Sequence, residues 1–271
     1  MFLFISFLLG LAPFLLGLAV GSFLNALIWR IEKGETVLRG RSYCPHCRHV
    51  LSWYDLIPVL SFVFLQGRCR YCTKPISWQY PVVELATGIL FVLVFRYLNF
   101  DIVSDFGFRI SDFFHLLYLW FIAGILLAVF FYDLKHSIIP DQVVYAGIAI
   151  ALFYRILGFA QSYDWAPDRM IGWILPAVFF LLIYVVSKGR WLGFGDVKLA
   201  LLMGLFLGWP KVLIALFVAV FLGAAVGLAL IALQKKTMKS EIPFGPFLIT
   251  GTFAAFFFGE NLIAWYLRLL I

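Results

Sequence analysis

The stretch KVLIALFVAVFLGAAVGLALIAL, residues 211–233, carries a single charged residue, at its first position. A run of about 20 apolar residues is long enough to cross the ~30 Å hydrocarbon core of a bilayer as a helix. Similar runs recur along the chain of 271 residues, which is 64% hydrophobic and only 13% charged. A soluble protein with a large core would show amphipathic periodicity, which these runs lack. The sequence therefore predicts an all-α, polytopic membrane protein.

The apolar runs predict eight transmembrane helices. They lie at residues 2–29, 82–98, 113–132, 139–158, 170–187, 197–209, 211–233 and 243–265. We do not expect the first run to be a removable signal peptide, because it lacks a basic start, is too long and is followed directly by Arg30.

The basic residues predict the orientation of these helices. Fifteen of the 21 lysine and arginine residues fall in the connections on one side of the eight runs, whereas the opposite connections are rich in aspartate. Since short cytoplasmic loops are enriched in Lys and Arg, we expect the basic side to face the cytoplasm and both termini to lie outside it. The net charge of +7 then reflects this bias. A nucleic-acid-binding surface is not expected, because the basic residues flank helices instead of lining a groove.

The connection between the first two runs divides the chain into three predicted parts. These are a first transmembrane helix (1–29), a cytoplasmic loop (30–81) and a transmembrane domain (82–271). The loop is the only long connection, and it holds all four cysteines of the chain.

The four cysteines predict a structural zinc site. They follow the pattern C-x2-C-x21-C-x2-C, which is close to the spacing of four-thiolate zinc sites, and they are Cys44, Cys47, Cys69 and Cys72. A redox pair or disulfides are the alternatives, but the reducing cytoplasm disfavours stable disulfides, and two pairs fit a metal better than one redox centre. His46 and His49 are expected on the loop surface, although either could replace a cysteine as ligand.

Four acidic residues lie at the cytoplasmic ends of predicted spans, and they are Glu84, Asp133, Asp141 and Asp196. Charges placed there are costly and by default indicate a functional site. Asp196, in LGFGDVKLA (192–200), begins a segment whose fourteen residues cover only about 21 Å. Asp133 ends a run that begins near Phe113. Both carboxylates are therefore expected at similar depth on different helices.

A close pair of carboxylates predicts aspartic-protease chemistry. Two such groups share one proton, so that one acts as base on a water and the other donates to the carbonyl oxygen. Asp133 and Asp196 are the predicted pair. Gly193 and Gly195 would allow a substrate strand to approach closely. Taken alone, GxGD also fits an ordinary helix start capped by aspartate.

The two remaining acids have less defined roles. Asp141 follows Pro140, and proline beside an acidic residue is a common helix start; Asp141 is the reserve catalytic candidate. Glu84 could pair with arginines of the loop, and its role stays open.

Together these residues resemble the bacterial type IV prepilin peptidases, the bifunctional family of leader peptidases and N-methyltransferases. The resemblance covers most of the chain in the family's order. It rests on the paired CxxC motifs and on GSFLNALIWR (21–30), IPVLSFVFLQGRCRYC (57–72), ISWQYPVVEL (76–85), DLKHSIIPD (133–141) and GFGDVKL (193–199).

This resemblance implies an enzyme of the bacterial inner membrane that acts on prepilins and pseudopilins. The family cleaves on the cytoplasmic side after the glycine of a short basic leader, and then methylates the new N-terminal residue with S-adenosylmethionine. Its catalytic acids match Asp133 and Asp196, and the cysteine loop resembles the part associated with methyl transfer. The sequence departs from the commonest family pattern at Asp55 and Gln66, both in that loop, which bears on methylation more than on cleavage.

Two other functions remain open. A presenilin-like intramembrane protease also uses a Tyr-Asp pair, here Tyr132 and Asp133, together with GxGD, but the cysteine loop and the position of both acids near the cytoplasmic edge disfavour it. A proton-coupled transporter would show broken helices in matching halves, and no such symmetry is visible. The sequence contains no strand–GxGxxG–helix context, so the residues that bind the methyl donor are not identified. Neither the oligomeric state nor the choice among pilus, secretion and competence systems is indicated.

Overall fold

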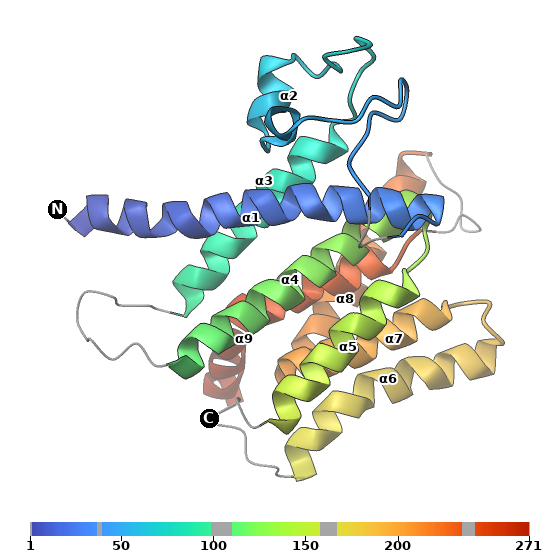
Figure 1. Ribbon diagram of the computed structural model, residues 1–271. Coiled ribbons are helices and arrows are strands. Elements are labelled where there is room, and N and C mark those ends of the chain that lie inside the picture. Colours follow the sequence, from blue (N-terminus) through green and yellow to red (C-terminus); the bar gives the residue numbers. More distant parts are fainter. Residues whose placement is uncertain (1, 37–39, 99–109, 158–166, 235–241, 271) are drawn as a thin grey trace. The chain divides into compact units, whose positions relative to one another are not determined.

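The computed structural model describes residues 2–36, 40–98, 110–157, 167–234 and 242–270 (Figure 1). Within these ranges the chain forms helices and no β-strand, which confirms the predicted all-α class. The helices are α1 (Phe2–Lys33), η1 (Trp53–Leu56), α2 (Leu60–Phe64), α3 (Gln79–Tyr97), α4 (Ile110–His136), α5 (Asp141–Ile156), α6 (Pro167–Ser187), α7 (Phe194–Leu207), α8 (Lys211–Ala232) and α9 (Gly245–Leu270).

Each of the eight predicted apolar runs coincides with one helix, but the helices differ in length. Among the described residues, α1 from Gly10 onward, α3, α4, α8 and α9 are long and apolar enough to cross a bilayer, which makes five candidate spans. The other three, α5, α6 and α7, do not reach that length and composition, and the apolar part of α6 is Ile171–Ser187.

Several helices extend past the apolar runs into charged residues. The last turn of α4 contains Lys135 and His136, and that of α1 contains Arg30 and Lys33. Intrahelical hydrogen bonds do not end where the hydrocarbon ends, and cations in a last turn interact favourably with the free carbonyl groups there. Apolar runs alone therefore underestimate helix length.

The chain divides into two compact units, Met1–Ala128 and Val129–Ile271, and the division falls within α4. In the first unit, α1 and α3 pack closely. A methyl group at Gly17 would lie 2.7 Å from the Cα of Gly88, and one at Gly21 would lie 2.6 Å from the Cα of Glu84. Small residues at a helix–helix contact allow the two backbones to approach in this way.

In the second unit, α7 is the central helix, and it packs against α5, α6, α8 and α9. Leu199, Leu202 and Met203 on α7 are fully buried. The C-terminal end of α7 is held by the buried Arg155 of α5, whose guanidinium donates to the carbonyl oxygens of Leu205 and Phe206 at 3.0 and 3.1 Å. These contacts satisfy carbonyl groups that a helix end leaves free, and they fix the helix that carries Asp196.

Candidate active site and cysteine cluster

Asp196 lies in the first turn of α7, and its carboxylate folds back on the start of that helix. The backbone N–H of Gly193 donates to Oδ2 of Asp196 at 3.2 Å. Because this bond satisfies an N–H group near the helix start, α7 begins at Phe194, three residues before the predicted apolar run. The capping role that a lone GxGD allows is thus present, and the same bond orients the carboxylate.

Asp133 lies near the C-terminal end of α4 and is almost completely buried, with 3% of its surface exposed. The backbone N–H of Gly245, the first residue of α9, donates to its carboxylate. A methyl group at Gly245 would lie 2.5 Å from Oδ2 of Asp133. A hydrogen bond to a backbone amide at this close approach fixes the carboxylate and leaves no room for a side chain.

The structure brings Asp133 and Asp196 close enough to interact electrostatically. Asp196 is 9% exposed, so both carboxylates are buried. The buried Ile139 lies between the two helix starts: a methyl group at Gly195 would lie 2.9 Å from its Cβ, and one at Gly245 would lie 3.5 Å from its Cδ1. Two buried carboxylates that interact in this way disfavour the ionisation of both groups at once.

No pattern in the sequence predicts Gly245 or Ile139 as part of this site. The segment IPFGPFL (242–248) carries a signal for a turn, because glycine stands directly before proline. Nothing in the sequence indicates that this turn lies against Asp133, since the contact joins residues more than a hundred positions apart.

Asp141, the reserve candidate, is the first residue of α5, with Pro140 immediately before the helix. Its carboxylate forms an ion pair with Lys198 of α7. The Lys198 side chain is buried, and its ammonium group lies 5.2 Å from the ring centroids of both Tyr145 and Phe194. Asp141 is thus a helix-start residue that pairs with a cation.

The four cysteine sulfurs form one cluster, in which all Sγ atoms lie within 4.8 Å of one another. A tetrahedral zinc ion with Zn–S bonds of about 2.3 Å separates its sulfurs by about 3.8 Å. The Sγ atoms of Cys44 and Cys72 lie 3.8 Å apart. The donor set and its spacing therefore fit a four-thiolate zinc ion.

Each CxxC pair lies on a turn of the same design. In the first, the N–H of Cys44 donates to the carbonyl oxygen of His49 at 3.0 Å, and the N–H of Arg48 donates to that of Cys44 at 2.9 Å. Arg48 has a positive φ of 56°.

The second turn repeats this pattern. The N–H of Cys69 donates to the carbonyl oxygen of Lys74 at 2.8 Å, and the N–H of Thr73 donates to that of Cys69 at 2.9 Å. Thr73 has a φ of 58°. Two equivalent turns facing each other present two sulfurs each.

The thiol of Cys72 resists ionisation without a cation. Although a hydrogen bond from the Lys74 backbone favours the thiolate of Cys72, burial and hydrogen bonds with Cys69, Cys47 and Cys44 raise the pKa of Cys72 to about 12. A divalent metal supplies the positive charge that converts such thiols into thiolates. Among the described residues the cluster contains no histidine. His46 and His49 are exposed, and the ring centroids of His49 and Tyr71 lie 3.6 Å apart with the rings tilted by 31°.

Two acids organise the loop around this cluster. The buried Glu84 of α3 accepts a hydrogen bond from the N–H of Val59 at 2.7 Å. Asp55 of η1 accepts hydrogen bonds from Arg70 at 2.8 Å and from Tyr71 at 3.1 Å. Burial raises the pKa of Asp55, but these donors outweigh it, and the net effect is a lower pKa. Asp55 therefore joins η1 to the second cysteine turn, and Glu84 joins the loop to α3.

Comparison with known proteins identifies the family. Residues 15–98 match the Bacterial Peptidase A24 N-terminal domain, and residues 120–228 match the Type IV leader peptidase family. The "Prepilin leader peptidase/N-methyltransferase" of Aeromonas hydrophila is 32% identical over 94% of this chain and 92% of its own length.

Proteins with the same name in Legionella pneumophila and Bacillus subtilis (strain 168) are 32% and 28% identical. The match to the Legionella protein covers 93% of this chain and 92% of that protein. The match to the Bacillus protein covers 94% of this chain and 97% of that protein. No solved structure gives a significant match. The chain belongs to the type IV leader peptidase family.

Proposed function

We propose that this protein cleaves the leader peptides of type IV prepilins and pseudopilins, and then N-methylates the new N-terminal residue. The observation that carries the proposal is the convergence of two buried carboxylates, Asp133 and Asp196, each held by a backbone N–H group. The names of the relatives support both activities.

The proposed cleavage uses the two carboxylates in different protonation states. The ionised one accepts a proton from a water molecule as the water oxygen bonds to the scissile carbonyl carbon. The protonated one gives its proton to the carbonyl oxygen. When the resulting diol collapses, one of its hydroxyl groups returns a proton to the carboxylate that was protonated at the start, the C–N bond breaks, and the leaving amine takes the proton that the other carboxyl group had accepted from water. The N–H groups of Gly193 and Gly245 keep both carboxylates oriented through these steps.

We propose the following membrane arrangement. The eight helices α1 and α3–α9 lie in the bacterial inner membrane with both termini outside the cytoplasm, and Asp133 and Asp196 face the cytoplasmic side. The chain then comprises a first transmembrane helix (1–29), a cytoplasmic zinc loop (30–81) and a transmembrane peptidase domain (82–271). The excess of Lys and Arg in connections on one side supports this orientation.

We propose that Cys44, Cys47, Cys69 and Cys72 hold one zinc ion. Four protein ligands leave no open position for water, so zinc bound there supplies a structural cross-link and does not activate a nucleophile. The loop that it shapes is proposed to serve methyl transfer from S-adenosylmethionine.

One assay tests the function against its alternatives. Purified protein in detergent is mixed with a prepilin and with methyl-labelled S-adenosylmethionine, and leader release and label incorporation are measured separately. We expect both reactions. Cleavage without methylation would favour the presenilin-like alternative, and neither reaction would favour the transporter.

Removing half of the cysteine cluster is expected to separate the two activities. In the double variant Cys44→Ser with Cys47→Ser, metal analysis should show the loss of about one zinc per chain. Methylation of pre-cleaved pilin should fall much further than cleavage, because a small domain that loses its metal unfolds, whereas membrane helices keep their internal hydrogen bonds.

The matched variant for this test is Asp196→Asn, which should keep its zinc and still methylate a pilin supplied without its leader. Equal loss of both reactions in both variants would indicate a single shared site and contradict the proposal.

Asp141→Asn is expected to keep cleavage within about fivefold of the unmodified protein, because the asparagine amide oxygen can still accept a hydrogen bond from the buried Lys198, and an ion pair with one solvent-exposed partner contributes roughly 0–1 kcal/mol. The Asp141 side chain is 59% exposed where it pairs with Lys198. Initial rates of leader release provide the measurement. Complete loss in a correctly inserted variant would place Asp141 among the catalytic residues instead.

A further inference from the structure

The loop between α1 and α3 exposes a set of large apolar side chains on and beside α2. Phe64 is 81% exposed, Trp53 77% and Trp78 73%, and Leu60 and Val63 are exposed as well. We call these five residues the apolar face. Exposed apolar surface of this kind indicates contact with a membrane or another protein.

The apolar face continues the exposed side of α3. Trp78, which precedes α3, begins a stripe of exposed apolar residues at intervals of three and four positions, and its further members are Val82, Leu85, Ile89 and Leu93. This spacing places them on one face of the helix, and α3 is a candidate membrane span. The ring of Phe62 in α2 lies 5.0 Å from that of Trp78. Side chains of α2 therefore lie beside the end of a stripe suited to lipid.

A hydrogen bond sets the depth of α2 along α3. The N–H of Val59, directly before α2, donates to the carboxylate of Glu84 at 2.7 Å. Glu84 lies five residues into α3, counted from Gln79, which corresponds to about 7.5 Å along the helix axis. Helices that lie in a membrane interface bury their apolar side by about 5–10 Å. With the bilayer surface at the start of α3, the start of α2 lies at the depth of an interfacial helix.

The backbone at this point is unusual for its residue type. Val59 has a φ of 60°, which β-branched residues strongly avoid. The bond to Glu84 holds the strained residue, and Leu60, Val63 and Phe64, which follow it, are exposed.

Charge beside the apolar face favours an anionic partner. Arg68 follows α2 by one turn, with its N–H donating to the carbonyl oxygen of Leu65 at 3.0 Å, and it is exposed. Tryptophan is enriched at membrane–water interfaces, and basic residues there bind anionic headgroups.

We propose that the cysteine loop docks on the membrane through the apolar face, with α2 lying in the headgroup region of an anionic phospholipid bilayer. The loop is then anchored at two places, by Glu84 inside the protein and by the apolar face in lipid. The anchor holds the cysteine cluster at the membrane surface.

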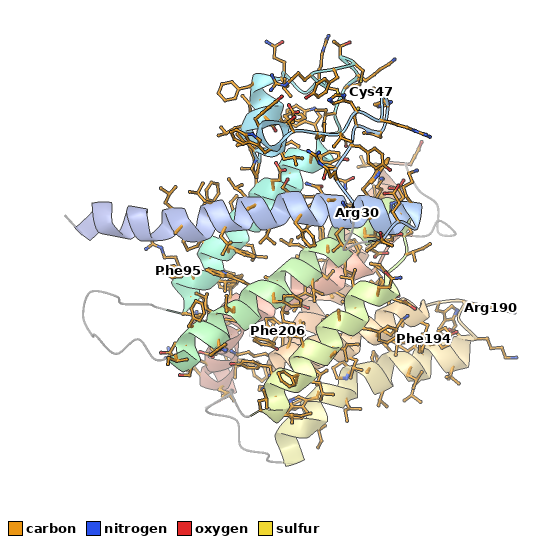
Figure 2. All side chains as sticks on the ribbon, in the orientation of Figure 1. Arg30, Cys47, Phe95, Arg190, Phe194 and Phe206 are labelled. Atoms are coloured by element: carbon orange, nitrogen blue, oxygen red, sulfur yellow. The ribbon has the colours of Figure 1, made fainter. Side chains whose placement is uncertain are left out.

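Photo-crosslinking of the full-length protein tests this proposal. Benzoylphenylalanine is placed at Phe64, and in a second variant at Val63, and each protein is reconstituted in nanodiscs of phosphatidylethanolamine and phosphatidylglycerol. Phe217, which is highly exposed on the candidate span α8, provides a lipid-facing reference. His46 provides the matched control, because it is exposed and directly precedes Cys47, which lies on the side of the loop away from α2 (Figure 2).

After illumination, mass spectrometry of the chain measures lipid adducts. We expect the yield of lipid adducts at positions 64 and 63 to be similar to the yield at position 217, and at least about tenfold higher than the yield at position 46. The reason is that burial of even one large apolar side chain favours the docked state by about that factor. Lipid yields at 64 and 63 no higher than at 46 would overturn the proposal. Adducts with an added pilin peptide, or crosslinks within the chain, in place of lipid adducts would also overturn the proposal.

Discussion

Replacing Asp196 by asparagine is expected to lower the rate of leader cleavage by at least about a thousandfold, and Asp133→Asn should have an effect of the same size. The proposed chemistry needs one ionised and one protonated carboxylate at the same time. An amide can neither accept the proton of the attacking water nor donate a proton to the carbonyl oxygen. Single-turnover leader release from a purified prepilin measures the effect.

The matched control is Asp112→Asn, the same substitution at the other end of α4. Asp112 is separated from Asp133 by 21 residues, or about 31 Å along the helix. We expect this variant to cleave at nearly the normal rate. If Asp133→Asn or Asp196→Asn retained near-normal turnover after correct insertion, that residue would have no catalytic role.

Gly245→Ala is expected to lower cleavage by about a hundredfold, because a displacement of about 1 Å in a catalytic group costs rate on that scale. The added methyl group would lie 2.5 Å from Oδ2 of Asp133, which is closer than a carbon and an oxygen can pack. Either the carboxylate or the start of α9 has to move. The hydrogen bond from the Gly245 N–H then changes as well.

Gly227→Ala in α8 separates this effect from a general intolerance of alanine. A methyl group there would meet its nearest neighbour, Ile242, at 3.8 Å, an ordinary packing distance. We expect Gly227→Ala to cleave normally and Gly245→Ala to methylate pre-cleaved pilin normally. Equal cleavage rates in the two glycine variants would show that the Gly245–Asp133 contact does not matter for catalysis.

The sequence predicts the helices well because hydropathy acts over long segments. An uninterrupted apolar run such as 211–233 has few alternatives to a helix in lipid, and α8 occupies Lys211–Ala232. The helices η1 and α2 in the cysteine loop are not predicted. They have four and five residues, too few for a periodic signal, and contacts with Asp55 and Glu84 support them.

The same distinction applies to the candidate site. Asp133 and Asp196 could be paired from sequence because both are acids at the ends of apolar runs, so that depth alone brings them to one level. Gly245 and Ile139 could not be assigned to the site from the sequence. Their role depends on which helix starts meet in the fold, and neither residue has a side chain that marks a reactive site. The cysteine spacing predicted a shared metal, whereas the identical hydrogen bonds of the two turns appear only in the structure.

The enclosure of α7 has a consequence for the substrate. Four helices pack against α7, and Arg155 holds its C-terminal end. Asp196 is therefore a stationary group, because sliding α7 toward a peptide would disrupt the packing of Leu199 and Leu202. The substrate has to adapt instead. If the proposed prepilin substrate is helical at the bond to be cut, each carbonyl there is engaged by its own backbone, so that the segment has to unwind before water can attack it.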